Sequence, residues 1–382
     1  MRHTAHPRSI ATGLLLLAAC ASPPAITPPD GRFKAEGSRP RPPLVAAEGE
    51  GGKLTIDLFD LAGTGEAVLV RCPCPGAPHR LLIDAGAADA VDKGGEARFQ
   101  KALGALIPAG ESIDVALVSH EDPAHLGGVP WLLETYRVGM YVDNGRTARN
   151  DATWNRAEEA LRAFPPPYYV NVRREGGPVV EVDFCPRTDV TAEVLRPAGF
   201  GHTRFADEAS LIVRVVHGEA VALLTGDAGR EQEESLLRDP LLTERLRCDL
   251  LKVGNGGDRA SSTPAFLAAA QPRIAAIACP PAGVGKNRQL GHPTKVVLDR
   301  LAKHLQDRPG GKVTLRVCDD TAPPPAQTDE LGEPIPEPEG VTMDIDWAGT
   351  WRDVEIDRAV WLTAGMDDLR FESDGRRFGL AE

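Results

Sequence analysis

The order of strand and helix patterns along the chain predicts an α/β fold, in which two packed mixed β-sheets carry helices on their outer faces (an αββα sandwich). Two observations lead to this prediction. Short apolar runs separated by turn residues come first, as in β-hairpins, and include Leu54–Phe59 and Ala67–Val70. Strands that alternate with helices come later, as in Leu250–Val253 followed by a helix that opens at Thr263.

The individual elements follow from local patterns. Asn150 and Asp151 are good helix caps ahead of Ala152–Ala163, and Pro264 stands in a first helical turn, where its missing N–H costs nothing. The expected strands are Leu54–Phe59, Ala67–Val70, Leu81–Asp84, Val115–Ser119, Tyr168–Val172, Thr191–Leu195, Leu211–Val216, Ala220–Thr225, Leu250–Val253, Ile274–Ala278 and Val313–Val317. The expected helices are Pro130–Tyr136, Ala152–Ala163, Arg230–Leu237, Thr263–Ala270 and Thr294–His304.

Composition excludes several classes of protein. The chain has 382 residues and 42% hydrophobic residues, which is ordinary for a globular protein and excludes wholesale disorder. Its formal net charge of -12 makes it a poor match for tight nucleic-acid binding, because phosphates would be repelled.

The N-terminus predicts export and a lipid anchor. Arg2 and Arg8 precede a short apolar stretch, Ile10–Ala19, which ends in Leu17-Ala18-Ala19-Cys20. This pattern is similar to a bacterial lipobox, so we expect a signal peptide at 1–19 and a lipidated Cys20 that binds the membrane. An ordinary secretory signal is the alternative. The expected location is the bacterial cell envelope, facing the periplasm or the cell exterior.

Domain boundaries follow from proline and charge. Residues 20–50 are rich in proline and predict a disordered tether between the anchor and one domain at 51–320. Residues 321–340 predict an acidic, proline-rich loop, and 341–382 predict further strands of the same domain.

Six cysteines besides Cys20 permit disulfides in an exported protein, since the chain has 7 in all. Cys72 and Cys74 are too close in the chain to bridge to each other easily, so each is expected to reach another segment. A metal site at these thiols is disfavoured, because paired spacing is missing.

Polar residues that carry chemistry stand at strand ends. Asp84-Ala85-Gly86 ends one strand, and the segment from His120 to Gly128 follows another. Thr225-Gly226-Asp227 ends a third, and Gly254-Asn255-Gly256 ends a fourth. Gly291-His292-Pro293 precedes a late helix.

Taken in this order, these motifs resemble the metallo-β-lactamase superfamily, and most of all the C-terminal domain of ComEC-type competence proteins. The resemblance covers roughly residues 54–317 and implies the metallo-β-lactamase αββα sandwich, a site for one or two metals, and hydrolysis; ComEC-type domains are thought to act as nucleases. It implies metal ligands at His120, Asp122 and Asp227, and an acid at Asp84 that orients them. We expect Asn255, which departs from the family pattern, to lie behind the ligands as well. The resemblance places His125 at the last ligand position of the motif and implies catalytic roles for Asp227 and for His292 as a substrate contact. In a hydrolase with one metal we expect His125 to carry a proton, while a water, or less readily His125 or Asn255, completes the metal site.

The chain departs from the family pattern at the second metal. Ala124 stands where a ligand Asp is expected, and Asn255-Gly256 replaces a pair of histidines. Asp122 and Asp227 alone supply too little negative charge for two buried divalent ions. We therefore expect one Zn²⁺, or Mn²⁺ or Fe²⁺ in its place, or no metal at all.

Two functions remain open at this point. One is a non-catalytic or weakly active, membrane-anchored relative of ComEC-type metallohydrolases. The alternative is a mononuclear hydrolase, phosphodiesterase-like, that uses a metal-bound water. Each of these residues also has a purely structural alternative. His120 and His125 could be relics bonded to backbone, and Asp227 could cap the next helix. Lys252 could lie on a solvated rim.

Overall fold

We describe the fold from a computed structural model of the chain. It describes residues 52–61, 65–74, 78–88, 98–146, 151–186, 188–197, 200, 209–283, 287–308, 312–319, 350–363 and 368–381. All of them lie in one compact unit, Ala35–Glu382. The predicted signal peptide 1–19, Cys20, the tether 20–50, the acidic loop 321–340 and residues 341–349 of the C-terminal segment lie outside the described residues.

The first sheet combines the early hairpins with the last strands of the chain. Its strands are β1 (Leu54–Leu58), β2 (Val68–Arg71), β3 (Arg80–Ile83), β4 (Ser112–Leu117), β5 (Arg137–Asp143), β6 (Tyr168–Asn171), β16 (Leu369–Ser373) and β17 (Phe378–Leu380). They lie in the order β17-β16-β1-β2-β3-β4-β5-β6. Pairing is antiparallel from β17 to β3 and parallel from β3 to β6. The carboxyl ends of β3 and β4 are therefore neighbours at one edge of this sheet.

The second sheet has the same division into antiparallel and parallel parts. Its strands are β7 (Val179–Val182), β8 (Val190–Leu195), β9 (Ile212–His217), β10 (Ala220–Leu224), β11 (Leu250–Lys252), β12 (Ile274–Ile277) and β15 (Val360–Leu362). They lie in the order β15-β12-β11-β10-β9-β8-β7. Strands β10, β11, β12 and β15 pair in parallel, so the carboxyl ends of β10 and β11 are also neighbours.

The two sheets pack face to face, and alternation along each strand builds the layers. On β1, Leu54, Ile56 and Leu58 join a buried cluster that also contains Val213 and Val215 of β9. The residues that alternate with these along each strand point to the outer face of the sheet, where they pack under helices. The apolar core between the sheets is thus shared by both.

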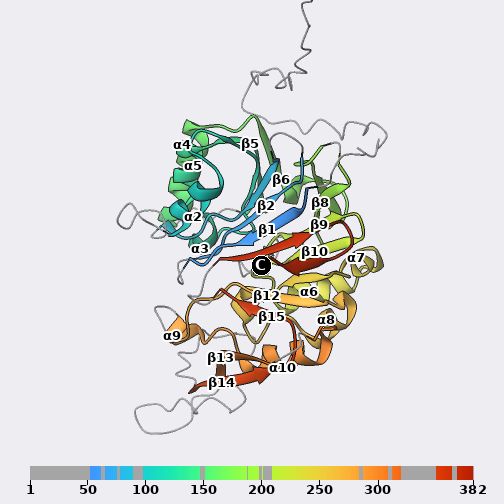
Figure 1. The fold of residues 1–382 in the computed structure, drawn as a ribbon. Helices are drawn as coiled ribbons and strands as arrows, with labels where there is room; N and C mark the ends of the chain where they lie inside the picture. The colour runs from blue at the N-terminus through green and yellow to red at the C-terminus, as the bar shows by residue number, and fades with distance from the viewer. Residues whose placement is uncertain are drawn as a thin grey trace, which may run out of the picture. The chain divides into compact units, whose positions relative to one another are not determined.

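Helices cover the outer face of each sheet, as Figure 1 shows. The first sheet carries α2 (Arg98–Leu106), α3 (Pro123–Leu126), α4 (Val129–Thr135) and α5 (Ala152–Ala163), and their apolar side chains form one cluster with it. The second sheet carries α6 (Arg230–Leu237), α7 (Pro240–Arg245), α8 (Pro264–Ala270) and α10 (Lys295–His304) in another cluster. The predicted αββα sandwich is confirmed.

Smaller elements complete the described chain. The ribbon of β13 (Val313–Asp319) and β14 (Thr350–Ile356) is antiparallel and packs beside α10, and α9 (Asn287–Leu290) is a single turn. Among the described residues, every helix falls short of the length or the apolar character that crossing a bilayer demands.

Helix starts were readable from the sequence because their caps are local. The Asp151 carboxylate accepts the N–H groups of Thr153 and Trp154 at 2.7 and 3.0 Å, and α5 has the predicted bounds. Strand β5 was missed, because its first half alternates poorly: Arg137 is exposed and Gly139 has no side chain. Strand β16 was missed as well, and its position depends on pairing with β1, which lies far away in the sequence.

A buried carboxylate ties two helices of the second outer layer together. Glu233 of α6 is 2% exposed and accepts the N–H groups of Ser262 and Thr263 at 2.5 and 2.8 Å, just ahead of α8. Burial raises the pKa of Glu233 to about 7, although the hydrogen bonds from Thr263 and Ser262 oppose the shift. The folded state therefore retains a proton at pH values where the unfolded chain has lost it.

We expect Glu233 to make the free energy of unfolding fall as pH rises from its ordinary pKa of 4.5 to about 7. The loss amounts to about 3 kcal/mol, since each pKa unit corresponds to about 1.4 kcal/mol. Glu233→Gln should flatten this slope in urea denaturation measured from pH 4.5 to pH 8. Glu234→Gln changes an exposed neighbour and should leave the slope unchanged; an unchanged slope in Glu233→Gln would contradict the assignment.

Candidate metal centre

Four strand ends converge at one edge of the sandwich. Asp84 follows β3 and His120 follows β4 in the first sheet, while Asp227 follows β10 and Asn255 follows β11 in the second. The Leu211 N–H donates to the Ser119 oxygen at 2.9 Å, and the Asn255 N–H donates to the Gly226 oxygen at 3.1 Å. The first bond joins the two sheets, and the second joins two neighbouring loops of the second sheet, where the carboxyl ends of β10 and β11 meet.

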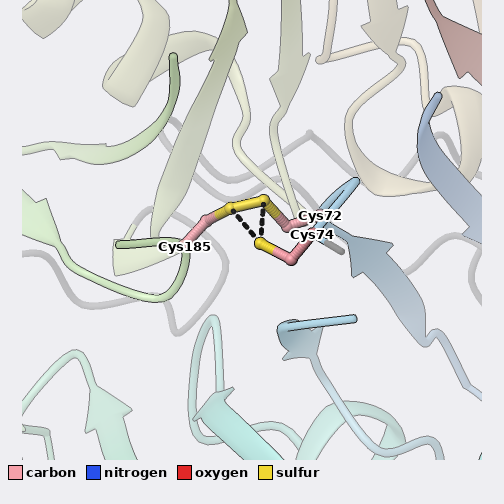
Figure 2. Close-up of side chains that lie close together, drawn as sticks. All are labelled: Cys72, Cys74 and Cys185. Carbon is pink, nitrogen blue, oxygen red and sulfur yellow. Dashed lines mark hydrogen bonds between the residues drawn. A yellow bond between two sulfur atoms is a disulfide. The ribbon is translucent and has the colours of Figure 1, made fainter. Parts of the chain in front are cut away.

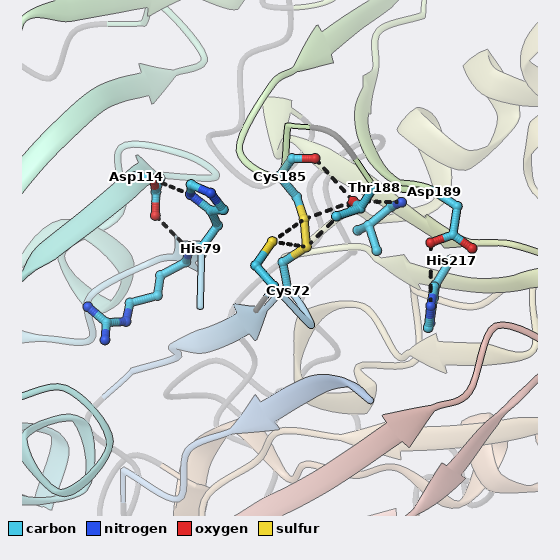
Figure 3. Close-up of a disulfide and its surroundings, with 10 residues drawn as sticks. Cys72, His79, Asp114, Cys185, Thr188, Asp189 and His217 are labelled. Carbon is cyan, nitrogen blue, oxygen red and sulfur yellow. Dashed lines mark hydrogen bonds and ion pairs between the residues drawn. A yellow bond between two sulfur atoms is a disulfide. The ribbon is translucent and has the colours of Figure 1, made fainter. Parts of the chain in front are cut away.

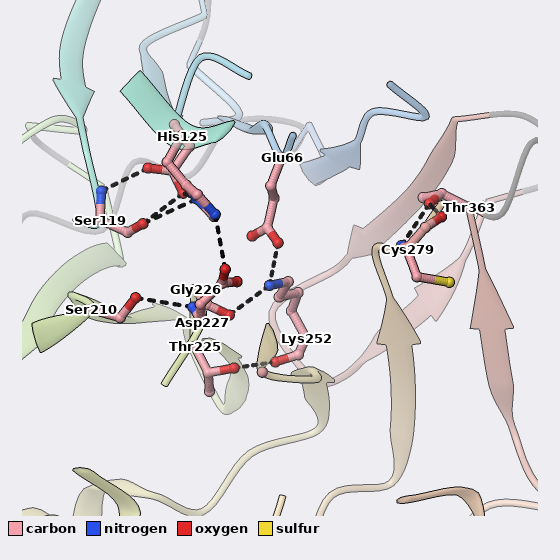
Figure 4. Close-up of polar contacts among 12 residues, drawn as sticks. Glu66, Ser119, His125, Ser210, Thr225, Gly226, Asp227, Lys252, Cys279 and Thr363 are labelled. Atoms are coloured by element: carbon pink, nitrogen blue, oxygen red, sulfur yellow. Dashed lines mark hydrogen bonds and ion pairs between the residues drawn. The ribbon is translucent and has the colours of Figure 1, made fainter. Parts of the chain in front are cut away.

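A cluster of two imidazoles and one carboxylate lies at this edge. The ligand atoms of His120, His125 and Asp227 all lie within 4.8 Å of one another. His125 Nε2 is 3.0 Å from Asp227 Oδ2, and His120 Nε2 is 4.0 Å from the same oxygen. Figure 4 shows His125 pointing down onto Asp227. We refer to these three residues as the His–His–Asp cluster.

Both rings of the cluster are held from behind through Nδ1. His120 Nδ1 lies 3.0 Å from Ser119 Oγ and 3.2 Å from Ser210 Oγ. His125 Nδ1 lies 2.8 Å from Asp84 Oδ2. Each ring therefore turns Nε2 toward Asp227, which is how histidines that bind metals are usually oriented.

Asp84 is the anchor of this arrangement. It is 1% exposed, and its carboxylate accepts the Ser119 N–H at 2.6 Å and the Ser119 hydroxyl at 2.8 Å as well as the His125 ring. Its φ of 62° lies in the left-handed region, where Asp is tolerated better than most residues. Asp84 therefore fixes the loop after β4 together with the ring of His125.

Gly226 lets the Asp227 loop approach the first sheet. Its φ is 51°, and a Cβ on it would lie 2.9 Å from Ser210 Oγ and 3.2 Å from Ser119 Cβ. The Asp227 N–H donates to Ser210 Oγ at 3.0 Å. The suggested cap role of Asp227 is wrong, because α6 begins after Gly229.

The charged groups of the cluster shift one another's pKa values. Burial alone would raise the pKa of Asp227, but the charge and hydrogen bond of His125, with His120 and Lys252, hold it well below its usual range. Burial disfavours a charge on His125, yet Asp227 and Asp84 together hold its pKa well above the usual value. Burial and the charge of His125 lower the pKa of His120. The two acidic neighbours therefore favour a proton on His125, whereas burial and the charge of His125 disfavour one on His120.

A buried ion pair that we did not predict lies beside the cluster. Lys252 is 0% exposed, donates to the Gly226 oxygen at 2.8 Å and pairs with the carboxylate of Glu66 (Figure 4). Burial raises the pKa of Glu66 to about 7, against the opposing charge of Lys252. The expectation that Lys252 lies on a solvated rim is wrong, because β11 runs inward between two strands. The sequence contained one indication that Lys252 is buried, namely its position within the apolar strand Leu250–Val253.

Three predicted site residues lie outside the cluster. The Asp122 carboxylate accepts the Ala124 N–H at 2.7 Å and caps α3, so it is engaged at the helix start. Asn255 reaches the Asp227 loop through its backbone N–H. His292 Nε2 lies 3.4 Å from Asp258 Oδ2, and although burial opposes it, His292 holds the pKa of Asp258 below its usual range.

Comparison with known sequences establishes the family. The model of the metallo-beta-lactamase superfamily matches residues 63–280, which is more than half of the chain. The chain therefore belongs to the metallo-beta-lactamase superfamily, and the resemblance seen in its strand-end motifs is confirmed.

Individual relatives cover part of the chain. It is 27% identical to ComE operon protein 3 of Bacillus subtilis (strain 168) over 277 residues, which are 69% of this chain and 32% of that protein. It is 29% identical to competence protein ComA of Neisseria gonorrhoeae over 246 residues, which are 64% of this chain and 29% of that protein. The chain thus spans about a third of the length of these curated relatives. Among solved structures, it is similar to a variant of the CmlA beta-hydroxylase, with 16% identity and a TM-score of 0.39 over 68% of this chain and 52% of that one.

The Lys252–Glu66 pair generates a stability prediction. Lys252→Met should lower the free energy of unfolding by about 3–5 kcal/mol, because it leaves the buried Glu66 without its partner. Lys252→Met combined with Glu66→Gln should recover part of this loss in urea denaturation. Lys312→Met, at an exposed ion pair, should change stability by less than about 0.5 kcal/mol. The pairing would be contradicted if the double variant lost as much free energy of unfolding as Lys252→Met and Glu66→Gln lose together when measured separately.

Proposed function

We propose that this chain is a metal-dependent hydrolase that works with one divalent ion held by His120, His125 and Asp227. One observation carries the proposal: both imidazoles turn Nε2 toward Asp227 while their Nδ1 atoms are bonded to Asp84, Ser119 and Ser210. This shared orientation gathers two imidazole nitrogens and one carboxylate oxygen within 4.8 Å of one another, as a metal ion requires. The ligand set differs from the predicted one, since His125 takes the place that we had assigned to Asp122.

The donor set fits a catalytic rather than a purely structural metal. Two histidines and one carboxylate are a common three-residue set for zinc, with a fourth position open to solvent or substrate. The Asp227 side chain is 18% exposed, whereas that of His120 is 0% exposed, so the cluster faces solvent on the Asp227 side. When bound there, a divalent ion would supply a Lewis acid that activates water near neutral pH.

One ion fits better than two. Ala124 and Gly256 offer no side-chain ligand, and Asn255 replaces an imidazole expected from the family pattern. The fixed positive charge of Lys252 lies close enough to Asp227 to lower the pKa of its carboxyl, so it opposes a second cation beside that group.

The remaining residues would position the reacting groups. Asp84 and the two serine hydroxyls keep the rings in place, and Asp258 orients His292, which we propose as a contact for substrate or leaving group. Phosphodiesters are the proposed substrate class, on the strength of the resemblance to ComEC-type domains. The net charge of -12 favours small phosphodiesters over long nucleic acids.

A non-catalytic binding module is the second candidate, and a different observation favours it. His125 bridges Asp84 and Asp227 with hydrogen bonds of 2.8 and 3.0 Å, and Lys252 bridges Glu66 and Gly226. The buried charges thus compensate one another within the chain, so the fold does not depend on a metal for its charge balance.

Metal content separates the two candidates. Protein purified without chelator and dialysed against Zn²⁺ should hold close to one ion per chain by elemental analysis, and should hydrolyse bis-p-nitrophenyl phosphate. His120→Ala and Asp227→Asn should lose both properties. Asp84→Asn should weaken metal affinity by about 10–100-fold, because it frees the ring of His125.

Two controls make this test specific. Asp122→Asn should keep the metal, since Asn caps a helix as well as Asp does and the cluster does not use this side chain. His304→Ala changes a histidine at the end of α10 and should have no effect. Two ions per chain would contradict the single-ion site, and a chain that binds none would favour the non-catalytic module.

We also propose that Cys20 carries a lipid that holds the protein in the bacterial cell envelope. The pattern at 1–20 supports this, and so does the disulfide between Cys72 and Cys185, because such bonds persist mainly in oxidising compartments.

The anchor can be tested in a bacterial host that is fed an alkyne fatty acid. The full chain should incorporate the label and partition into Triton X-114, because a diacylated cysteine is strongly apolar. Cys20→Ser should remain unlabelled and stay in the aqueous phase. A label that persists in Cys20→Ser would contradict the assignment.

A further inference from the structure

Three cysteines meet far from the His–His–Asp cluster, between loops of the two sheets. Cys72 and Cys74 follow β2 in the first sheet, and Cys185 lies between β7 and β8 in the second. Cys72 and Cys185 form a disulfide across 113 residues of sequence, with their Cα atoms 6.1 Å apart. The bond therefore ties the two sheets to each other.

The third sulfur touches both sulfurs of this disulfide. Cys74 Sγ lies 3.5 Å from Cys72 Sγ and 3.7 Å from Cys185 Sγ, as Figure 2 shows. Cys74 is partly exposed, whereas Cys72 is 2% exposed. Contact between a thiol and a disulfide is one requirement of thiol–disulfide exchange. Since Cys74 Sγ is nearly equidistant from both sulfurs, it lies beside the bond, and its side chain must rotate to attack Cys185 in line with the bond.

A hydroxyl group lies beside the same bond. Thr188 Oγ1 is 3.0 Å from Cys185 Sγ and 3.7 Å from Cys72 Sγ (Figure 3). The Val190 N–H donates to this oxygen at 3.1 Å and holds it in place. The hydroxyl donates its single proton to the Cys185 carbonyl oxygen at 3.2 Å, and it can turn that proton toward a sulfur that becomes negatively charged.

We propose that Cys72, Cys74 and Cys185 form a thiol–disulfide exchange site, in which Cys185 changes its partner from Cys72 to Cys74. The Cys74 thiolate attacks Cys185 Sγ, the bond from Cys185 to Cys72 breaks, and its electron pair leaves with Cys72 Sγ. The proton that Cys74 gave up ends on the Cys72 thiolate. One disulfide and one thiol are present before and after, so no external oxidant or reductant is consumed.

Attack at Cys185 is favoured over attack at Cys72. A bond from Cys74 to Cys72 would close a tight ring across Pro73, whereas a bond to Cys185 keeps the two sheets linked. Exchange therefore moves the free thiol from a partly exposed position to a buried one and leaves the crosslink intact. Burial raises the pKa of the Cys74 thiol, so the reactive thiolate is a minor form and the exchange is slow.

Two-colour alkylation of the full chain tests this site. Samples incubated at pH 8.5 are quenched in acid, labelled with iodoacetamide in denaturant, reduced, and labelled with N-ethylmaleimide before peptide mapping. The first label should appear on Cys74 and increasingly on Cys72, while Cys185 receives the second label. Cys248, a buried thiol outside this site, should take the first label fully and report its completeness.

Matched variants make the outcome decisive. Cys74→Ser should lower the first label on Cys72 by at least about tenfold, because the attacking thiol is gone. Thr188→Val should slow its appearance without abolishing the crosslink. Cys72→Ser incubated with oxidised glutathione should join Cys74 to Cys185. The proposal is overturned if Cys72 never takes the first label in the unaltered chain, or if all three cysteines take it.

Discussion

The apolar layer between the two sheets is the constraint on which the site depends. Leu54, Ile56 and Leu58 of β1 share it with Val213 and Val215 of β9, so neither sheet can shift without exposing buried surface. Because both sheets change from antiparallel to parallel pairing, each has two neighbouring carboxyl ends at the same edge. Packing of the sheets brings these four ends together. The polar loops that follow them therefore meet at one edge of the sandwich.

Charge compensation is the second level of organisation at that edge. Three buried or nearly buried carboxylates, Asp84, Asp227 and Glu66, would repel one another if they stood alone. Lys252 pairs with Glu66, and His125 lies between Asp84 and Asp227. The same contacts that balance the charges also orient the rings, which is why a site that has lost several family ligands keeps an ordered geometry. The cysteine cluster adds a covalent link between the same two sheets at a different place.

Sequence patterns were informative where the interaction is local. The caps of α5 and α10 and the strand ends at Asp84 and Asp227 were all readable, because a helix cap or a strand terminus involves residues a few positions apart. Lys252 and Glu66 were not recognised as a pair, since they lie far apart in the sequence and no local pattern shows that one faces the other. The cap that Asp122 forms on α3 was not predicted, although the interaction is local: its carboxylate accepts the N–H of Ala124, two residues further on.

The sequence by itself determined the family, the αββα architecture, and which chemical groups stand at the strand ends. These properties depend on residue type and on order along the chain, both of which a single sequence contains. Only the tertiary structure decided that His125 rather than Asp122 joins His120 and Asp227, that Lys252 is buried against Glu66, and that Cys74 lies against the bond between Cys72 and Cys185. Such contacts depend on how distant loops pack on one another, and no local pattern specifies the rotamers that packing selects.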